Sequence, residues 1–143
     1  KKERREVLQE LVDETRTIII YEAPHKLVKT LKDLKETLGN RRITLCRELT
    51  KKHETAFHTT IDQLIAYYEN EKPLGECVLV IEGKSRQELK KEAEASWEEI
   101  SIEEHMEIYE SKGLSRKDAM KQVAKDRGVS KREIYQYLVN GEK

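Results

Sequence analysis

Two polar clusters carry the side chains in this chain that are best suited to chemistry. Residues 21–26 read Tyr-Glu-Ala-Pro-His-Lys, and residues 47–54 read Arg-Glu-Leu-Thr-Lys-Lys-His-Glu. In such clusters arginine and lysine can hold phosphate or carboxylate groups, while glutamate or histidine can orient a hydroxyl group or take its proton. The candidates for these roles are Tyr21, Glu22, His25, Arg47, Glu48, Thr50, Lys51 and Glu54.

Each cluster follows a segment with the composition of a β-strand. Residues 18–21 form a β-branched run that predicts a buried strand, and residues 42–47 predict a second one. Ligands of open α/β sheets bind in the crevice at the carboxyl ends of strands, so we expect both clusters to line one cleft. The alternative is that these polar residues only pair with one another at the surface, because strand ends are generally polar.

The remaining elements predict an α/β fold. A leucine stripe predicts a helix between Pro24 and Gly39, and a capping box predicts another helix that begins after Thr60. Two more strands are expected, at residues 56–59 and 76–83, the latter apolar enough to lie inside the sheet with both faces covered. The order strand–helix–strand–strand–helix–strand indicates an α/β layer with a mixed sheet.

Other classes of site find no support in the sequence. The six glycines are too scattered for a glycine-rich phosphate loop, and no HExxH or CxxC pattern organises the histidines and cysteines into a metal site. We expect no metal, and free thiols at Cys46 and Cys77 in a reducing cytosol, with a disulfide or metal pair as the alternative. The lack of a long apolar run and the charged residues 1–6 predict a cytoplasmic protein with neither membrane helix nor secretory signal.

Charge divides the chain into three parts although its net charge is zero. Residues 1–81 carry 15 basic and 14 acidic side chains, residues 82–110 carry 4 and 10, and residues 112–132 carry 8 and 2. We expect an α/β lobe, an acidic helical linker and a small basic helical domain, at residues 1–83, 84–100 and 101–143 respectively.

The basic helical domain predicts contact with nucleic acid. Two short helices around Gly128 resemble a helix-turn-helix. Tyr135 and Tyr137 could stack on unpaired RNA bases. The alternative is a solubilising face, or one that docks onto the acidic linker. The residues expected to bind RNA phosphates are Arg116, Lys117, Lys121, Lys131 and Arg132.

Three motifs in this order resemble the tetrapyrrole methylase superfamily and, within it, the enzymes that methylate small-subunit ribosomal RNA. They are residues 21–27, residues 47–51 with Glu54, and residues 75–83. The helix-turn-helix-like end is also similar to the small C-terminal domain of those enzymes. The resemblance implies that this chain is a C-terminal fragment, the mixed-sheet second lobe followed by the helical domain. The absent first lobe would hold a glycine-containing loop and most of the S-adenosylmethionine site.

The resemblance also implies a reaction, the transfer of a methyl group from S-adenosylmethionine to the ribose 2′-hydroxyl of a cytidine in small-subunit ribosomal RNA. Alignment of the acceptor oxygen and removal of its proton are the two needs of such a step. The implied partners are the RNA or the ribosomal subunit, and a second copy of the chain in a homodimer. The fragment alone is expected to be inactive. Corrin or porphyrin methylation, or a non-enzymatic RNA- or DNA-binding module, remain alternatives.

Their positions in the two clusters indicate roles for these residues in the implied reaction. Arg47 and Lys51 would hold RNA phosphate or ribose, and the catalytic base or orienting group would be Glu48, Glu54 or His25. The remaining cleft residues would be Tyr21, Glu22 and Thr50.

Overall fold

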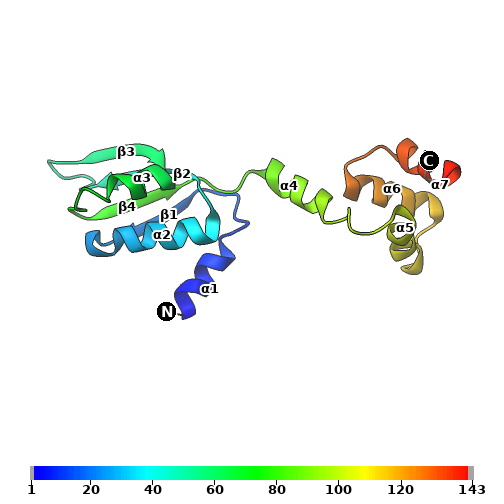
Figure 1. Cartoon of the computed structure of the whole chain (residues 1–143), viewed down its shortest axis with the longest axis horizontal. Helices are drawn as coiled ribbons and strands as arrows, with labels where there is room; N and C mark the ends of the chain where they lie inside the picture. Colours follow the sequence, from blue (N-terminus) through cyan, green and yellow to red (C-terminus); the bar gives the residue numbers. More distant parts are fainter. Residues whose placement is uncertain (1, 142–143) are drawn as a thin grey trace. The chain divides into compact units, whose positions relative to one another are not determined.

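The computed structural model of this chain describes residues 2–141, which divide after Ser85 into two compact units. We call them the α/β unit and the helical unit, and Figure 1 shows the elements of both in chain order. No helix within the described residues is both long and apolar enough to span a membrane.

The α/β unit is built on a four-stranded sheet in the order β1-β4-β2-β3. Every neighbouring pair of strands is antiparallel. The prediction of a mixed sheet is therefore wrong for the described strands. The crossover through α2 does leave β1 and β2 running in the same direction, but β4 lies between them and runs opposite to both. The elements are α1 (Lys2–Glu10), β1 (Ile18–Glu22), η1 (Pro24–Lys26), α2 (Leu27–Leu38), β2 (Arg42–Arg47), β3 (Thr55–Thr60), α3 (Ile61–Tyr67) and β4 (Cys77–Ile81).

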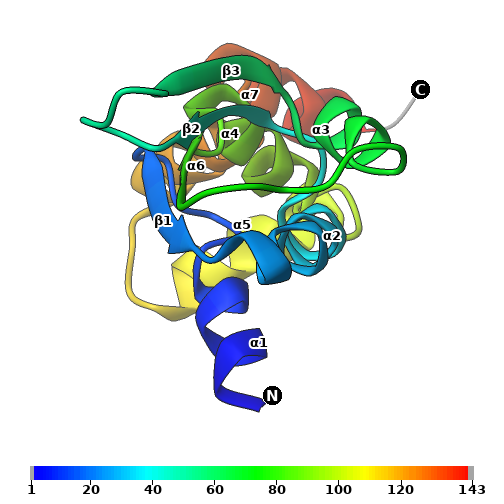
Figure 2. The same ribbon diagram turned by 90° about the vertical axis from the view of Figure 1, so that its left-hand side faces the viewer.

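Helices α2 and α3 pack against each other and against one face of this sheet (Figure 2). Leu31 and Leu34 of α2 are fully buried there, together with Leu45 of β2 and Leu79 of β4. Strand β4 takes the predicted interior position, yet its residues alternate between buried and half-buried, so only one of its faces belongs to the core. The opposite face of the sheet is open at β1, where Ile19 is 59% and Tyr21 81% exposed.

The helical unit consists of four helices, α4 (Arg86–Ala95), α5 (Ile102–Ser111), α6 (Arg116–Arg127) and α7 (Lys131–Asn140). Capping boxes begin two of these helices, Ser101 with Glu104 before α5 and Ser130 with Glu133 before α7. Gly128 ends α6 in the left-handed conformation, with φ 67°. A glycine is also needed here because a Cβ at this position would collide with the carboxylate of Glu94. The core of the unit contains Met106, Ala119, Val123, Ala124 and Ile134.

Candidate functional site

The carboxyl ends of β1 and β2 lie at the same edge of the sheet. The register pairs Glu22, the last residue of β1, with Cys77, and it pairs Arg47, the last residue of β2, with the same cysteine. Both polar clusters follow these strand ends, so the geometry brings their starting points together. Glu22, Cys77 and Arg47 form one row across three strands, and Thr55 of β3 continues it. We call these four residues the edge row.

Both charged members of the edge row are held by hydrogen bonds. The Glu22 carboxylate accepts one from the Ala23 amide at 2.9 Å and one from the Thr30 hydroxyl at 2.5 Å. Thr30 in turn accepts a hydrogen bond from Arg4 at 2.7 Å, which ties α1 to the site. On the other side of Cys77, Nε of Arg47 donates to the Thr55 hydroxyl at 3.3 Å.

Two neutral groups beside Arg47 are kept protonated by burial. Burial raises the pKa of the Cys77 thiol, and the positive charge of Arg47 only partly opposes this. Burial likewise raises the pKa of the Tyr68 hydroxyl, against the charge of Arg47 and a hydrogen bond with it. Cys77 is therefore no activated nucleophile, because nucleophilic chemistry needs the thiolate. Cys46 is a free thiol as well.

The loop between β2 and β3 has an unusual backbone. Glu48 and Thr50 adopt positive φ angles of 51° and 64°, and Thr50 is β-branched, a residue type that this region disfavours strongly. Local bonds hold the loop in this shape. The Glu54 carboxylate accepts a hydrogen bond from the Thr50 amide at 2.6 Å. Such conformations persist only where the surroundings enforce them, and they cluster at functional sites.

Glu48 fastens this loop to the start of β4. Its carboxylate accepts a hydrogen bond from the Glu76 amide at 2.9 Å and pairs with Lys51 at 3.1 Å. Lys51 also pairs with the Glu76 carboxylate at 3.1 Å. The bond to Lys51, then the bond to the Glu76 amide, lowers the pKa of Glu48. A carboxylate with a lowered pKa is a weaker proton acceptor, so the geometry suits Glu48 to a positioning role.

Two candidates lie apart from the edge row. Tyr21 neighbours Glu22 in sequence, but successive strand residues point to opposite faces, so its ring lies on the open face of the sheet. His25 lies in η1 with an exposed side chain. No hydrogen bond or ion pair within the described residues joins His25 to residues 47–54. The structure therefore joins Glu22 to Arg47 through Cys77, but it leaves Tyr21 outside that row.

Three residues of this site were not predicted from the sequence. Thr30 is 3% exposed and lies between Leu27 and Leu31 on the inward face of α2, where a polar residue is a detectable anomaly. Tyr68 and Phe57 gave no such signal. They line a hollow of about 270 Å³ beside Arg47, and their rings flank Tyr67 at centroid distances of 5.0 and 5.5 Å.

The helical unit contains a buried polar cluster around His105. The imidazole is fully buried and stacks on Trp97 at 3.9 Å between ring centroids. Nε of Arg127 donates to His105 Nδ1 at 3.0 Å, and His105 Nε2 lies 3.0 Å from the Asp126 carboxylate, which also accepts from the Tyr109 hydroxyl. Burial lowers the pKa of His105, helped by the charge of Arg127 and opposed by Asp126. These bonds define a neutral imidazole that carries its proton on Nε2.

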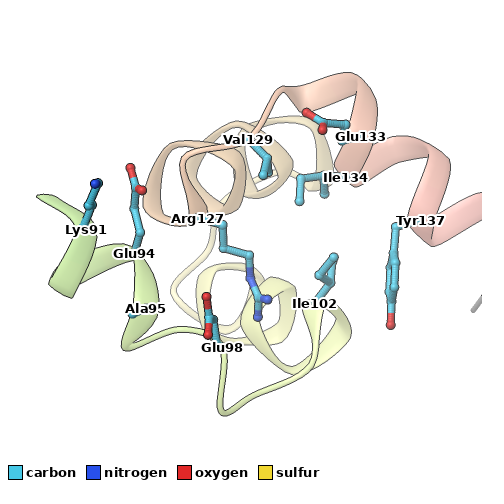
Figure 3. Close-up of a pocket in the computed structure, with 10 residues that line it drawn as sticks. All are labelled: Lys91, Glu94, Ala95, Glu98, Ile102, Arg127, Val129, Glu133, Ile134 and Tyr137. Atoms are coloured by element: carbon cyan, nitrogen blue, oxygen red, sulfur yellow. The ribbon is translucent and has the colours of Figure 1, made fainter.

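Beside this cluster lies a groove of about 580 Å³ with acidic side chains at its rim (Figure 3). Arg127 extends into the groove, and apolar residues line it (Figure 3). The acidic residues are Glu94, Glu98 and Glu133, and the apolar ones include Ile102, Val129 and Ile134. These three carboxylates outnumber the two basic side chains that line the groove, Lys91 and Arg127, so the groove is less favourable for an anionic ligand. No group of three or more potential metal-ligating side chains occurs among residues 2–141.

Comparison with known proteins gives a consistent family. Residues 1–65 match the family model of the tetrapyrrole (corrin/porphyrin) methylases. The chain is 44% identical over 135 residues to the ribosomal RNA small subunit methyltransferase I of Bacillus subtilis (strain 168), which is 94% of this chain and 46% of that relative. The protein of the same name from Halalkalibacterium halodurans is 42% identical over 135 residues, and that from Escherichia coli O157:H7 is 32% identical over 141 residues.

The chain thus spans about half the length of the curated relatives that it matches. The matched residues of the α/β unit include β1, β2 and the loop with the strained backbone. Over residues 1–65 the chain matches the tetrapyrrole (corrin/porphyrin) methylases, and over nearly its whole length it is similar to the relatives named above.

Proposed function

We propose that this chain is the C-terminal part of an S-adenosylmethionine-dependent methyltransferase that methylates the ribose 2′-hydroxyl of a cytidine in small-subunit ribosomal RNA. The names of the relatives support the substrate class. The single structural observation that supports the proposal is the convergence of both polar clusters on one edge of the sheet, where Glu22 and Arg47 flank Cys77.

Arg47 is the residue to which we assign RNA contact at this edge. No ion pair among the described residues engages it, and its guanidinium bonds only the neutral hydroxyls of Thr55 and Tyr68. Its positive charge is therefore available for a phosphate. Lys51 is a weaker candidate because Glu48 and Glu76 already share its ammonium group, and a phosphate would have to compete with both.

Removal of the 2′-hydroxyl proton is assigned to one of three residues. Glu48 is fastened to the Glu76 amide and Lys51, and Glu54 is fastened to the Thr50 amide, so both carboxylates hold the loop in place. The exposed side chain of His25 forms no hydrogen bond or ion pair within residues 2–141, and it can turn toward a substrate. Histidine is also the side chain that most often transfers protons in enzymes. We therefore place His25 ahead of the two glutamates.

S-adenosylmethionine would supply the methyl group. The carboxylates of Glu22, Glu48 and Glu54, which could otherwise bind its hydroxyl or amino groups, already accept hydrogen bonds within the chain. We therefore propose that most of the cofactor site lies in the other half of the longer protein, and we assign no step of the transfer to cofactor contacts of this chain.

The experiment that tests this function is an acceptor assay with the longer protein that contains this chain. Radiolabelled methyl groups from S-adenosylmethionine are offered to small ribosomal subunits and, separately, to a corrin and a porphyrin, the acceptors that the family description names. Label in the small-subunit RNA supports the proposal. Label only in the corrin or the porphyrin would mean that the protein methylates tetrapyrroles, and it would overturn the proposal.

A further inference from the structure

Helix α7 has an outward face that packs against nothing within the helical unit. Arg132, Tyr135, Gln136 and Val139 are all exposed, and their helical spacing places them on one side. Tyr135 is 56% and Val139 62% exposed. The buried Ile134 lies on the opposite side of the helix. This face offers an aromatic ring, a guanidinium and an amide to a partner.

The groove side of the same helix has the opposite character. Glu133 and Tyr137 face the groove, and Glu94 and Glu98 stand on its other wall (Figure 3). The three carboxylates outnumber Lys91 and Arg127, the basic side chains that line the groove, so their net charge directs an anionic partner away from it. The outward face, with Arg132, is the side of α7 that remains for such a partner.

The helical unit also carries basic side chains that no ion pair among the described residues engages. Lys117, Lys121 and Lys125 are exposed at four-residue intervals along α6, an arrangement in which like charges repel. Within residues 2–141, the side chains of these lysines form no hydrogen bond or ion pair, and neither do those of Lys131 and Arg132. The acidic residues of this segment are already engaged, Asp118 by Ser115 and Asp126 by His105 and Tyr109. A polyanion would relieve this repulsion.

We propose that the outward face of α7 binds an unpaired RNA strand, with Tyr135 stacking on a base, while the α6 lysines attract the RNA backbone. The inference rests on the proposed function, which makes RNA the partner. A paired RNA helix is a poor fit, because its major groove is too deep and narrow for side chains on an α-helix to read. Exposed aromatic rings beside basic side chains are how proteins bind single strands.

The test measures binding by the full chain. A fluorescently labelled, unpaired pyrimidine RNA and a paired RNA of equal length are titrated by anisotropy. The unpaired strand is expected to bind at least about tenfold more tightly. Tyr135→Ala should weaken that binding by about tenfold, as expected for the loss of one stacked base, while Tyr135→Phe should retain it because the ring remains.

The salt dependence provides a matched control. Lys121→Gln should reduce the slope of log affinity against log salt by about 0.7, the value for one contact with a single-stranded phosphate. Lys32→Gln removes an equally exposed lysine from α2 and should leave the slope unchanged. Circular dichroism of each variant verifies that it is folded.

Tighter binding to the paired RNA, or wild-type affinity of Tyr135→Ala for the unpaired strand, would overturn this inference. Neither result would contradict the proposed function, which the acceptor assay with the longer protein tests separately. If the longer protein labels no RNA although this chain binds unpaired RNA through Tyr135, the proposed function fails and the inference stands.

Discussion

Glu22 and Arg47, which lie 25 positions apart in the sequence, meet the same residue, Cys77, from the two sides of strand β4. Antiparallel pairing of β4 with both neighbours produces this relationship. It brings the two polar clusters to one edge although no ladder hydrogen bond joins β1 to β2. The buried, protonated thiol between them separates an acidic from a basic side chain at the candidate site.

Arg47→Ala in the longer protein should lower kcat/KM for small-subunit RNA by about tenfold to a hundredfold, the usual effect of losing a hydrogen bond to a charged group. The control is Arg42→Ala, which removes an exposed arginine from the opposite end of β2. Steady-state methyl transfer checks both variants. Equal kcat/KM values for the two variants would show that Arg47 does not contact the RNA.

Gly75→Ala and Gly39→Ala form a matched pair for the role of Glu48. Both glycines have a φ near 80°, where an alanine costs on the order of 1 to 3 kcal/mol of unfolding free energy. At Gly39 a Cβ meets nothing within 4 Å, whereas at Gly75 it would lie 2.2 Å from the Glu48 carboxylate. Gly75→Ala should therefore destabilise the α/β unit more, because it displaces Glu48 from Lys51 and Glu76. Urea unfolding followed by circular dichroism measures both, and equal losses would show that the Glu48 contacts contribute nothing.

Thr50→Gly should raise the free energy of unfolding, by at most about 1 kcal/mol, because glycine adopts a positive φ without steric cost but has more freedom when unfolded. The exposed Leu49 has no positive φ, so Leu49→Gly should lower stability instead. If the strained loop positions the site, Thr50→Gly also slows methyl transfer by the longer protein. If Thr50→Gly is more stable and fully active, the backbone strain at Thr50 is not needed for methyl transfer.

Trp97 should report the protonation of His105, since the rings stack and Trp97 is the only tryptophan of the chain. The lowered pKa of His105 places the change in tryptophan fluorescence below the ordinary value of 6.5. Since the unfolded state binds the proton first as the pH falls, this group's contribution to stability is complete above pH 6.5 and is lost below it.

The His105→Gln variant should abolish this fluorescence transition. A midpoint above pH 6.5 would mean that the hydrogen bond to Asp126 outweighs burial and the charge of Arg127.

Local signals predicted much of this fold, whereas long-range pairing did not follow from them. The leucine stripe of α2 and the start of α3 after Thr60 each depend on a single helix, and both appear as expected. The antiparallel sheet depends on where β4 inserts, which no local pattern encodes. The convergence of the two strand ends was predictable from the α/β order. The contact of Thr30 with Glu22 and the lysine bridge between Glu48 and Glu76 required the packed structure.

The most direct test of the central claim is alkaline cleavage of small-subunit RNA after reaction with the longer protein. Alkaline cleavage uses the 2′-hydroxyl as nucleophile, so a methyl group on that oxygen protects the adjacent linkage. The account predicts one newly protected linkage, on the 3′ side of a cytidine, that is lost or strongly reduced with Arg47→Ala. Methyl incorporation without any protected linkage would contradict 2′-O-methylation, and unchanged protection with Arg47→Ala would contradict the role of the sheet edge.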